Sequence, residues 1–336
     1  MVRFMKYDDL NKLRTEEYCR SLNDKDFLIK VGRSLQYLEQ ENYEDTGLPF
    51  IFVFGLPRSG TVLLNKILAR GFDCGYVNNF IARFWLSPIV GTELFRILYG
   101  NSRQISLEPA DIATTCDISD VHEFGYFWRH WLKIKKLEDG IIDKSDEIDW
   151  RGLRNKLLGI QQSFSKPLIM KNVFGIPYIK KLEQMFKNVL FVYIEREAAD
   201  VAISLEKVRK KIYGHNKHWI GTVPIEYFQI KDLEPVEQIA KQVYYLQKYY
   251  REILVNEATK YIVINYQDLC YNPNICLNQI NNAYNLFYEK YFKIKRRYLD
   301  VNRLNYKKYS NRTREKFNRI FEVLQNEGQG NSDSPA

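Results

Sequence analysis

Four short apolar runs recur along the chain, and amphipathic stretches with helical spacing separate them. The runs occupy residues 48–55, 166–172, 188–194 and 260–266. The first run is continuous and bounded by Pro and Gly, as in a strand that is buried on both faces of a parallel sheet. Helices are predicted over 60–70, 177–187, 198–211 and 235–257, with another after the Asn-Pro-Asn at 272–274. This alternation predicts an α/β fold with a doubly wound parallel sheet flanked by helices.

The remaining segments lack this alternation and suggest how the chain is organised. Residues 5–45 are polar and amphipathic, which predicts one or two helices, and residues 76–140 are rich in aromatics and predicted to be helical or irregular. We expect an N-terminal helical extension (1–47), an α/β core (48–285), a basic C-terminal subregion of the same domain (286–325) and a flexible, frayed tail (326–336).

Composition fits a globular protein with a sizeable core. The chain has 336 residues, of which 45% are hydrophobic and 15% aromatic. It has no apolar run of about 18 residues, so no transmembrane helix is expected, and the first residues lack the apolar centre of a signal peptide. The five cysteines are scattered and form no CxxC pair, which favours reduced thiols and a cytoplasmic location.

Positive charge is concentrated near the C-terminus. The formal net charge is +9, and residues 290–319 hold 12 Lys and Arg against 2 Asp and Glu. Such a tract indicates an anionic partner, which is a nucleotide phosphate, a polyanionic acceptor, a membrane surface or nucleic acid. The alternative is a solvated basic helix with no partner.

The segment FVFGLPRSGTVLL (52–64) has the form of a phosphate-binding loop. A strand, a Gly-containing turn and a helix start place backbone N–H groups around an anion. Aligned on the Walker A pattern, however, Thr61 stands where the Lys belongs and Val62 where the Mg²⁺-binding hydroxyl belongs. The one cation of the loop is Arg58, so we expect a P-loop-type core that binds a nucleotide without a metal.

The stretch LPRSGT (56–61) resembles the 5′-phosphosulfate loop of sulfotransferases that use 3′-phosphoadenosine 5′-phosphosulfate (PAPS), although Val62 replaces a frequent hydroxyl. The stretch 188–208 resembles the 3′-phosphate site of that family, with Arg196 just past a strand and Ser204 eight residues later. Ala198 stands in place of the usual Pro, which mainly favours helix initiation. An Arg fork and a Ser hydroxyl suit one phosphate.

Two weaker matches extend the resemblance to about residues 48–285. PLIMKN (167–172) resembles a strand-end segment of the family and places Lys171 at the carboxyl edge of the sheet. The stretch 263–280 resembles a segment that serves the fold, so Tyr266 and Asp268 receive structural roles.

The resemblance implies transfer of a sulfuryl group from PAPS to an acceptor hydroxyl or amine by in-line displacement, with no metal. Arg58 would neutralise charge that develops on the leaving 5′-phosphate, while Ser59, Gly60 and Thr61 hold it. Arg196 and Ser204 would bind the 3′-phosphate. Catalysis of this kind is mostly positioning and charge stabilisation.

The general base is not identified by these motifs, because the family uses either His or Glu. The stretch DVHEFGYFWRHWL (120–132) offers Glu123 first and His122 second, and Glu93 is a third candidate. A structural role for Glu123 at a helix start is the alternative. The aromatics nearby are candidates for an acceptor pocket or for the core: Phe124, Tyr126, Phe127, Trp128 and Trp131.

The basic tract contributes a possible lid. SNRTREKF (310–317) stands where the family often closes its nucleotide site with basic residues, and Arg312 and Lys316 share one face of a helix.

Expected partners are PAPS and a hydroxyl-bearing acceptor, with a glycan or glycolipid favoured and peripheral membrane contact as an option. The alternatives are a P-loop kinase or NTPase, a polyanion- or nucleic-acid-binding protein, and a sulfotransferase fold without activity; no nucleic-acid-binding motif is present.

Overall fold

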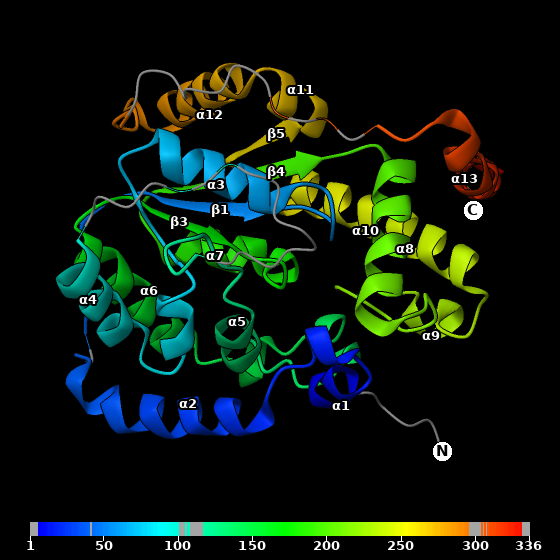
Figure 1. Cartoon of the computed structure of the whole chain (residues 1–336). Helices are drawn as coiled ribbons and strands as arrows, with labels where there is room; N and C mark the ends of the chain where they lie inside the picture. The colour runs from blue at the N-terminus through cyan, green and yellow to red at the C-terminus, as the bar shows by residue number, and fades with distance from the viewer. Residues whose placement is uncertain are drawn as a thin grey trace.

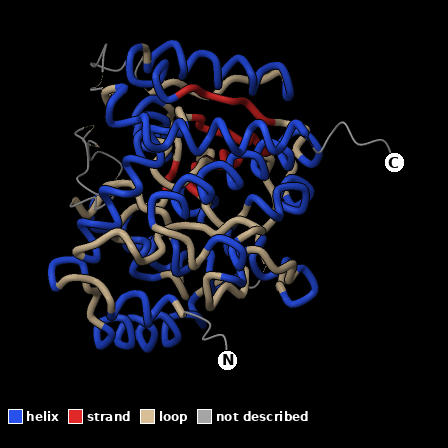
Figure 2. The backbone as a smooth tube through the Cα atoms, turned by 90° about the vertical axis from the view of Figure 1, so that its right-hand side faces the viewer, coloured by secondary structure: helices blue, strands red, loops and turns tan. Residues whose placement is uncertain are grey.

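The computed structural model describes residues 6–40, 42–100, 105, 107, 117–295, 304, 306 and 308–330. Within them, five parallel strands form one sheet in the order β2-β3-β1-β4-β5, with helices on both sides (Figure 1, Figure 2). The strands are β1 (Phe50–Phe54), β2 (Gly75–Tyr76), β3 (Leu168–Lys171), β4 (Val189–Glu195) and β5 (Tyr261–Asn265). The doubly wound α/β fold predicted from the sequence is confirmed.

The helices fall between the strands and on either side of them in the chain. They are α1 (Tyr7–Lys12), α2 (Leu22–Leu35), α3 (Thr61–Gly71), α4 (Pro88–Tyr99), α5 (Gly125–Trp131), α6 (Trp150–Phe164), α7 (Ile179–Met185), α8 (Ala198–Tyr213), α9 (Tyr227–Ile230), α10 (Pro235–Glu257), α11 (Tyr266–Tyr271), α12 (Pro273–Tyr288) and α13 (Asn311–Gly330). The two helices α1 and α2 agree with the prediction for residues 5–45.

The central strand β1 builds both halves of the core. All five of its residues are buried, and successive side chains of a strand point to opposite faces. Phe50, Phe52 and Phe54 pack into the larger apolar cluster with residues of α6, α8 and α10. Ile51 and Val53 pack into a second cluster with residues of α3 and α12 on the other face. A strand covered on both faces has no need for polar alternation, which explains the continuous apolar run.

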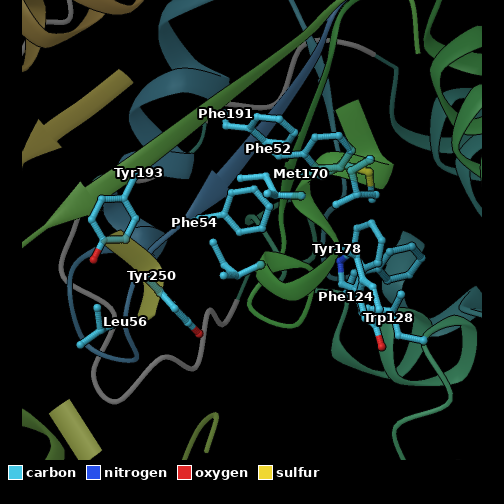
Figure 3. Packing of buried hydrophobic residues seen from close by; sticks show 14 of the residues in the cluster. Phe52, Phe54, Leu56, Phe124, Trp128, Met170, Tyr178, Phe191, Tyr193 and Tyr250 are labelled. Carbon is cyan, nitrogen blue, oxygen red and sulfur yellow. The ribbon is translucent and has the colours of Figure 1, made fainter. Parts of the chain in front are cut away.

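Aromatic rings fill much of the larger cluster. Figure 3 shows Phe52, Phe54 and Phe191 gathered along β1 and β4. The ring centroids of Phe52 and Phe191 are 5.9 Å apart, and those of Phe52 and Trp128 are 6.3 Å apart. These packed aromatic rings hold the sheet against the helices beneath it.

The crossovers diverge on the two sides of β1. The chain runs from β1 through α3 to β2 at one edge of the sheet, pairs β3 beside β1, and then crosses to place β4 on the opposite side of β1. In open parallel sheets, ligands bind in the crevice beyond the carboxyl ends of strands at such a switch point. The residues that follow β1 and β4 therefore lie where a ligand site is expected.

Two elements differ from the sequence-based expectations. The short strand β2 was not predicted, and its second residue, Tyr76, is the first of the stretch expected to be helical or irregular; two residues carry no periodic pattern, and pairing of Gly75 with Leu168 defines the strand. The tail expected to be frayed from residue 326 instead continues α13 as far as Gly330. The rest of the expected tail, 331–336, lies outside the described residues.

Ion pairs and apolar contacts hold the C-terminal helix α13 against α8. Arg314 binds the fully buried Asp200 through both carboxylate oxygens, with N–O distances of 2.8 and 2.6 Å. Lys316 Nζ lies 2.6 Å from Glu206 Oε2, and Phe317 is buried in the larger cluster. Asp200 and Glu206 flank Ser204 on α8, so α13 stabilises the helix on which Ser204 lies.

Two further findings concern membrane-spanning helices and cysteines. In the described part of the structure, no helix is both long and apolar enough to cross a membrane. Cys19, Cys74, Cys270 and Cys276 are free thiols, and Cys116 lies outside the described residues.

Removal of the Arg314 guanidinium is expected to destabilise the fold. In Arg314→Gln, the buried Asp200 loses its cationic partner, so the free energy of unfolding falls by roughly 3 kcal/mol in urea titrations. The matched control is Arg319→Gln on the same helix, where an exposed pair with Glu315 is lost and the change stays below about 0.5 kcal/mol. Equal losses of unfolding free energy in the two variants would contradict a stabilising role of the Arg314–Asp200 ion pair.

Candidate functional site

The turn between β1 and α3 leaves the start of α3 open. Gly60 is the N-cap residue at φ 108°, and no side chain caps the helix. The first backbone bond of the helix runs from the Leu64 N–H to the Gly60 carbonyl oxygen at 3.0 Å. The N–H groups that precede Leu64 therefore have no carbonyl partner within α3, and the positive end of the helix dipole points into the turn.

Two glycines are required by contacts of this turn. A Cβ on Gly60 would lie 2.4 Å from the ring of Tyr266, and the residue also needs its positive φ. A Cβ on Gly55 would lie 2.5 Å from Ser59 Oγ. Tyr266, which the sequence assigned to the fold, thus packs directly on the loop; its contact with Gly60 depends on how the end of β5 is placed relative to the end of β1, which no local signal reveals.

Arg58 is held in an unusual conformation at the centre of the loop. Its φ is 72°, in the left-handed region that L-residues seldom occupy. Its Nε donates to Ser204 Oγ at 3.2 Å, and Arg196 donates to the Arg58 carbonyl oxygen at 3.1 Å. The structure therefore brings together the three residues that the two sequence motifs contributed, from the turn after β1, the end of β4 and the middle of α8.

The loop is electrostatically suited to an anion. Burial, and then the neighbouring charge of Arg196, lowers the pKa of the Arg58 guanidinium. Arg58 makes no ion pair with any described residue, and the buried Ser59 Oγ has no hydrogen-bond partner there. Arg196 also lies over the Tyr266 ring, 4.3 Å from its centroid. A bound anion would relieve the repulsion between the two guanidinium groups.

Lys171 and Glu123 form an ion pair at the same edge of the sheet. Lys171 is the last residue of β3, and its Nζ donates to Glu123 Oε1. The Lys171 side chain is 4% exposed and that of Glu123 is 44% exposed. Partial burial opposes ionisation of Glu123, but the Lys171 ammonium outweighs it, so the pKa of Glu123 lies below its usual value. Glu123 is therefore an ionised carboxylate, and its charge opposes the lowering of the Arg58 pKa by burial.

His122 is placed differently from its neighbour. Its Nδ1 accepts a hydrogen bond from the Phe124 N–H at 2.8 Å, and its backbone N–H donates to the Val77 carbonyl oxygen at 2.9 Å. Burial lowers the pKa of His122 to about 4, so the imidazole is neutral at pH 7. A buried ion pair between Lys66 of α3 and Asp120, 3.1 Å long, ties this segment to the helix of the phosphate loop.

The other candidates from this part of the sequence separate into two groups. Glu93 lies on α4 and pairs with Arg96 at 2.8 Å, and no described contact joins it to the loop. Phe124, Phe127 and Trp128 are buried in the larger apolar cluster, where Figure 3 shows Phe124 and Trp128 beside Tyr178. Tyr126 and Trp131 are half-buried at its margin.

The C-terminal segment approaches the loop through a residue that the sequence did not single out. Burial lowers the pKa of Arg58, and Tyr309 is close enough to oppose that shift. Lys207 of α8 lies 4.2 Å above the Tyr309 ring. Lys316, one of two cations considered for a nucleotide lid, pairs with Glu206, and the other, Arg312, is exposed. Several other cations of the tract 290–319 lie outside the described residues.

A cavity opens beyond the end of β3. It is small and partly open to solvent, and its lining includes Tyr7, Val173, Phe174 and Tyr250. In the described ranges, no three His, Cys, Asp or Glu side chains are grouped closely enough to hold a metal ion. The groups that converge at this edge of the sheet are thus cations, hydroxyls and one ionised carboxylate.

These features define an α/β protein with an uncapped, positively charged loop at the carboxyl edge of its sheet. The sequence profile of the sulfotransferase family matches residues 49–290, which is most of the chain. The chain therefore belongs to the sulfotransferase family, and the resemblance inferred from the motifs is confirmed. Family and fold together support sulfuryl transfer as the general activity.

Two solved structures are similar to this chain at low sequence identity. Sulfotransferase STF9 from Mycobacterium avium is 12% identical with a TM-score of 0.53, over 94% of this chain and 80% of that one. Sulfotransferase STF1 from Mycobacterium tuberculosis H37Rv is 13% identical with a TM-score of 0.48, over 88% and 80%. A comparison with curated proteins by sequence finds no match.

The loop geometry predicts that replacing Gly60 even by Ala destabilises the protein. Gly60→Ala places a Cβ against Tyr266 and forces an L-residue to φ 108°, so the free energy of unfolding falls by at least about 1–2 kcal/mol. Gly125→Ala is the control, because a Cβ added there would meet nothing within 4 Å and the φ of Gly125 is not positive. Urea unfolding distinguishes them, and equal stability of both variants would refute the constraint at Gly60.

Proposed function

We propose that this protein transfers a sulfuryl group from PAPS to an acceptor hydroxyl. The observation that carries the proposal is Arg58, which lies beside the uncapped start of α3. Its backbone is in the left-handed region, and its side chain is half-buried without an ion-pair partner among the described residues. Such an arrangement is costly unless an anion balances it. A phosphate in the turn supplies that balance.

The residues around the loop fit a nucleotide with two separate phosphate positions. The open N–H groups of α3, together with Ser59 and Thr61, would hold the 5′-phosphate, because their donors surround the turn after Gly55. Arg196 and Ser204 would hold the 3′-phosphate; each already contacts Arg58, so both lie beside the first position. Neither position depends on a metal ligand from the chain.

In the proposed reaction, PAPS supplies the activated sulfur and the protein stabilises the charge that develops on the leaving phosphate. PAPS, when bound, supplies a sulfur atom activated by a good leaving group. The acceptor oxygen forms a new S–O bond as the bond from sulfur to the 5′-phosphate oxygen breaks, and the electron pair stays on that phosphate. Arg58 stabilises the negative charge that develops there, and this stabilisation is worth most in the transition state.

Glu123 is the proposed general base. Its carboxylate is ionised at neutral pH, it is partly exposed, and Lys171 fixes its position at the loop edge. It would accept the proton of the acceptor hydroxyl as the S–O bond forms. His122 is the weaker candidate because its Nδ1 already accepts a backbone hydrogen bond and burial lowers its pKa.

The acceptor is proposed to be a carbohydrate or a lipid-linked glycan. Trp131 lies at the margin of the core beyond Glu123, where a half-buried ring offers a face on which a sugar can stack.

Calorimetric titration with 3′-phosphoadenosine 5′-phosphate, without Mg²⁺, tests the donor site. Selective binding over 5′-AMP and ATP is expected, and Arg196→Gln should weaken it by about tenfold or more, since a charge-assisted bond is worth about 1.5–3 kcal/mol. Arg319→Gln, remote and exposed, is the control and should bind as the parent does. Equal affinity for all three nucleotides, or Mg²⁺-dependent ATP turnover, would overturn the proposal in favour of a kinase or NTPase.

The pH dependence of transfer tests the base. A base must be unprotonated, so the rate should fall as pH drops through the lowered pKa of Glu123. Lys171→Met removes the main group that lowers this pKa and leaves the burial that raises it, so the acid limb of the pH–rate profile moves to higher pH. Glu123→Gln should lower kcat by about 10²–10⁴-fold.

Lys166→Met is the control for this profile, because Lys166 pairs with Asp73 near the start of β3 and should leave the acid limb in place. An acid limb that does not move in Lys171→Met, or full activity in Glu123→Gln, would eliminate Glu123 as the base.

A further inference from the structure

Three cations surround one aromatic ring close to the proposed base. The charged groups of Arg20, Lys25 and Arg129 lie 5.9, 5.7 and 4.9 Å from the centroid of the Tyr126 ring. Tyr126 is on α5, three residues beyond Glu123, whereas Arg20 and Lys25 come from the N-terminal extension. We call Arg20, Lys25, Tyr126 and Arg129 the Tyr126 cluster.

Arg20 is the member of the cluster whose charge is least compensated. Lys25 is paired with both carboxylate oxygens of Asp8 at 2.7 Å. Arg129 lies over a second ring, Tyr7, at 4.3 Å, and its Nε donates to the Gly125 carbonyl oxygen. The Arg20 guanidinium makes no hydrogen bond or ion pair with any described residue and is exposed to solvent.

The backbone of Arg20 is nevertheless held firmly. Asn11 is only 8% exposed, and its Oδ1 accepts the Arg20 N–H at 3.0 Å. Its Nδ2 donates to the Arg20 carbonyl oxygen at 2.8 Å. A buried amide that binds one residue from both sides fixes where that side chain starts. The position of Arg20 is therefore preorganised, unlike that of a typical surface arginine.

The charge of Arg20 acts on the proposed base Glu123 and on its neighbour His122. Partial burial opposes ionisation of Glu123 and Lys171 favours it most, and Arg20 adds to the same lowering of the Glu123 pKa. Burial is the main cause of the lowered pKa of His122, and Arg20 and Arg83 lower it further. Arg20 thus lies within electrostatic range of the proposed base Glu123 and also near the Tyr126 ring.

We propose that the acceptor carries an anionic group (phosphate, sulfate or carboxylate) that binds Arg20 at the Tyr126 cluster while its hydroxyl meets Glu123. This inference rests on the proposed function and narrows its acceptor to hydroxyl compounds with a negative charge. Since Lys171 neutralises Glu123, the remaining excess positive charge attracts such an acceptor and repels a cationic one.

Binding of inorganic phosphate to protein saturated with 3′-phosphoadenosine 5′-phosphate tests this site directly. With the nucleotide positions filled, one further saturable phosphate site is expected by calorimetry. Arg20→Gln should weaken that site about tenfold or more, because it removes a charged donor. Arg33→Gln is the matched control: Arg33 is exposed on α2 of the same extension and should leave phosphate binding unchanged.

Transfer from labelled PAPS to matched acceptors gives the second readout. Glucose 6-phosphate and glucuronate should have kcat/KM at least about tenfold above glucose, and Arg20→Gln should remove this preference. No saturable phosphate binding, an unchanged affinity in Arg20→Gln, or equal use of charged and neutral acceptors would overturn the inference. If the nucleotide itself does not bind, the proposed function fails; if it binds and phosphate does not, only the anionic acceptor is excluded.

Discussion

All described strands of the sheet run in the same direction, and the site depends on that constraint. Parallel pairing requires each strand to end at the same edge, so the residues after β1, β3, β4 and β5 must meet there. Arg58, Lys171, Arg196 and Tyr266 stand at or just beyond these four strand ends. An antiparallel arrangement of the same strands would distribute them over both edges, and the contacts around Arg58 would not exist.

Some cations of the described residues are paired with carboxylates, and others are not. Arg314 and Lys316 are bound by carboxylates of α8, and Lys171 by Glu123, so these cations stabilise the fold or orient a side chain. Arg58 and Arg20 have no such carboxylate among the described residues. Arg58 and Arg20 are thus better indicators of where an anion binds than the net charge of the chain, because a cation paired with a carboxylate attracts anions only weakly.

Local sequence patterns were sufficient where each element buries a continuous face. Strands β1, β3 and β4 were predicted because the residues of a doubly covered strand are apolar throughout, and α8 because its apolar positions recur with helical spacing. The strand β2 was missed because two residues contain no period. The continuation of α13 to Gly330 was missed because Gly and polar residues mark a tail, whereas Phe317 and Phe321 anchor the helix to the core from its earlier turns.

The sequence by itself determined the α/β class, the phosphate loop around Arg58 and its likeness to sulfotransferases, because these are encoded in contiguous residues. Only the tertiary structure decided that Tyr266 packs on Gly60, that Lys171 pairs with Glu123, and that Lys316 faces Glu206 rather than the loop. The physical reason is that these contacts join residues far apart in the chain. Their formation depends on strand order and helix packing, which no local pattern of polar and apolar residues specifies.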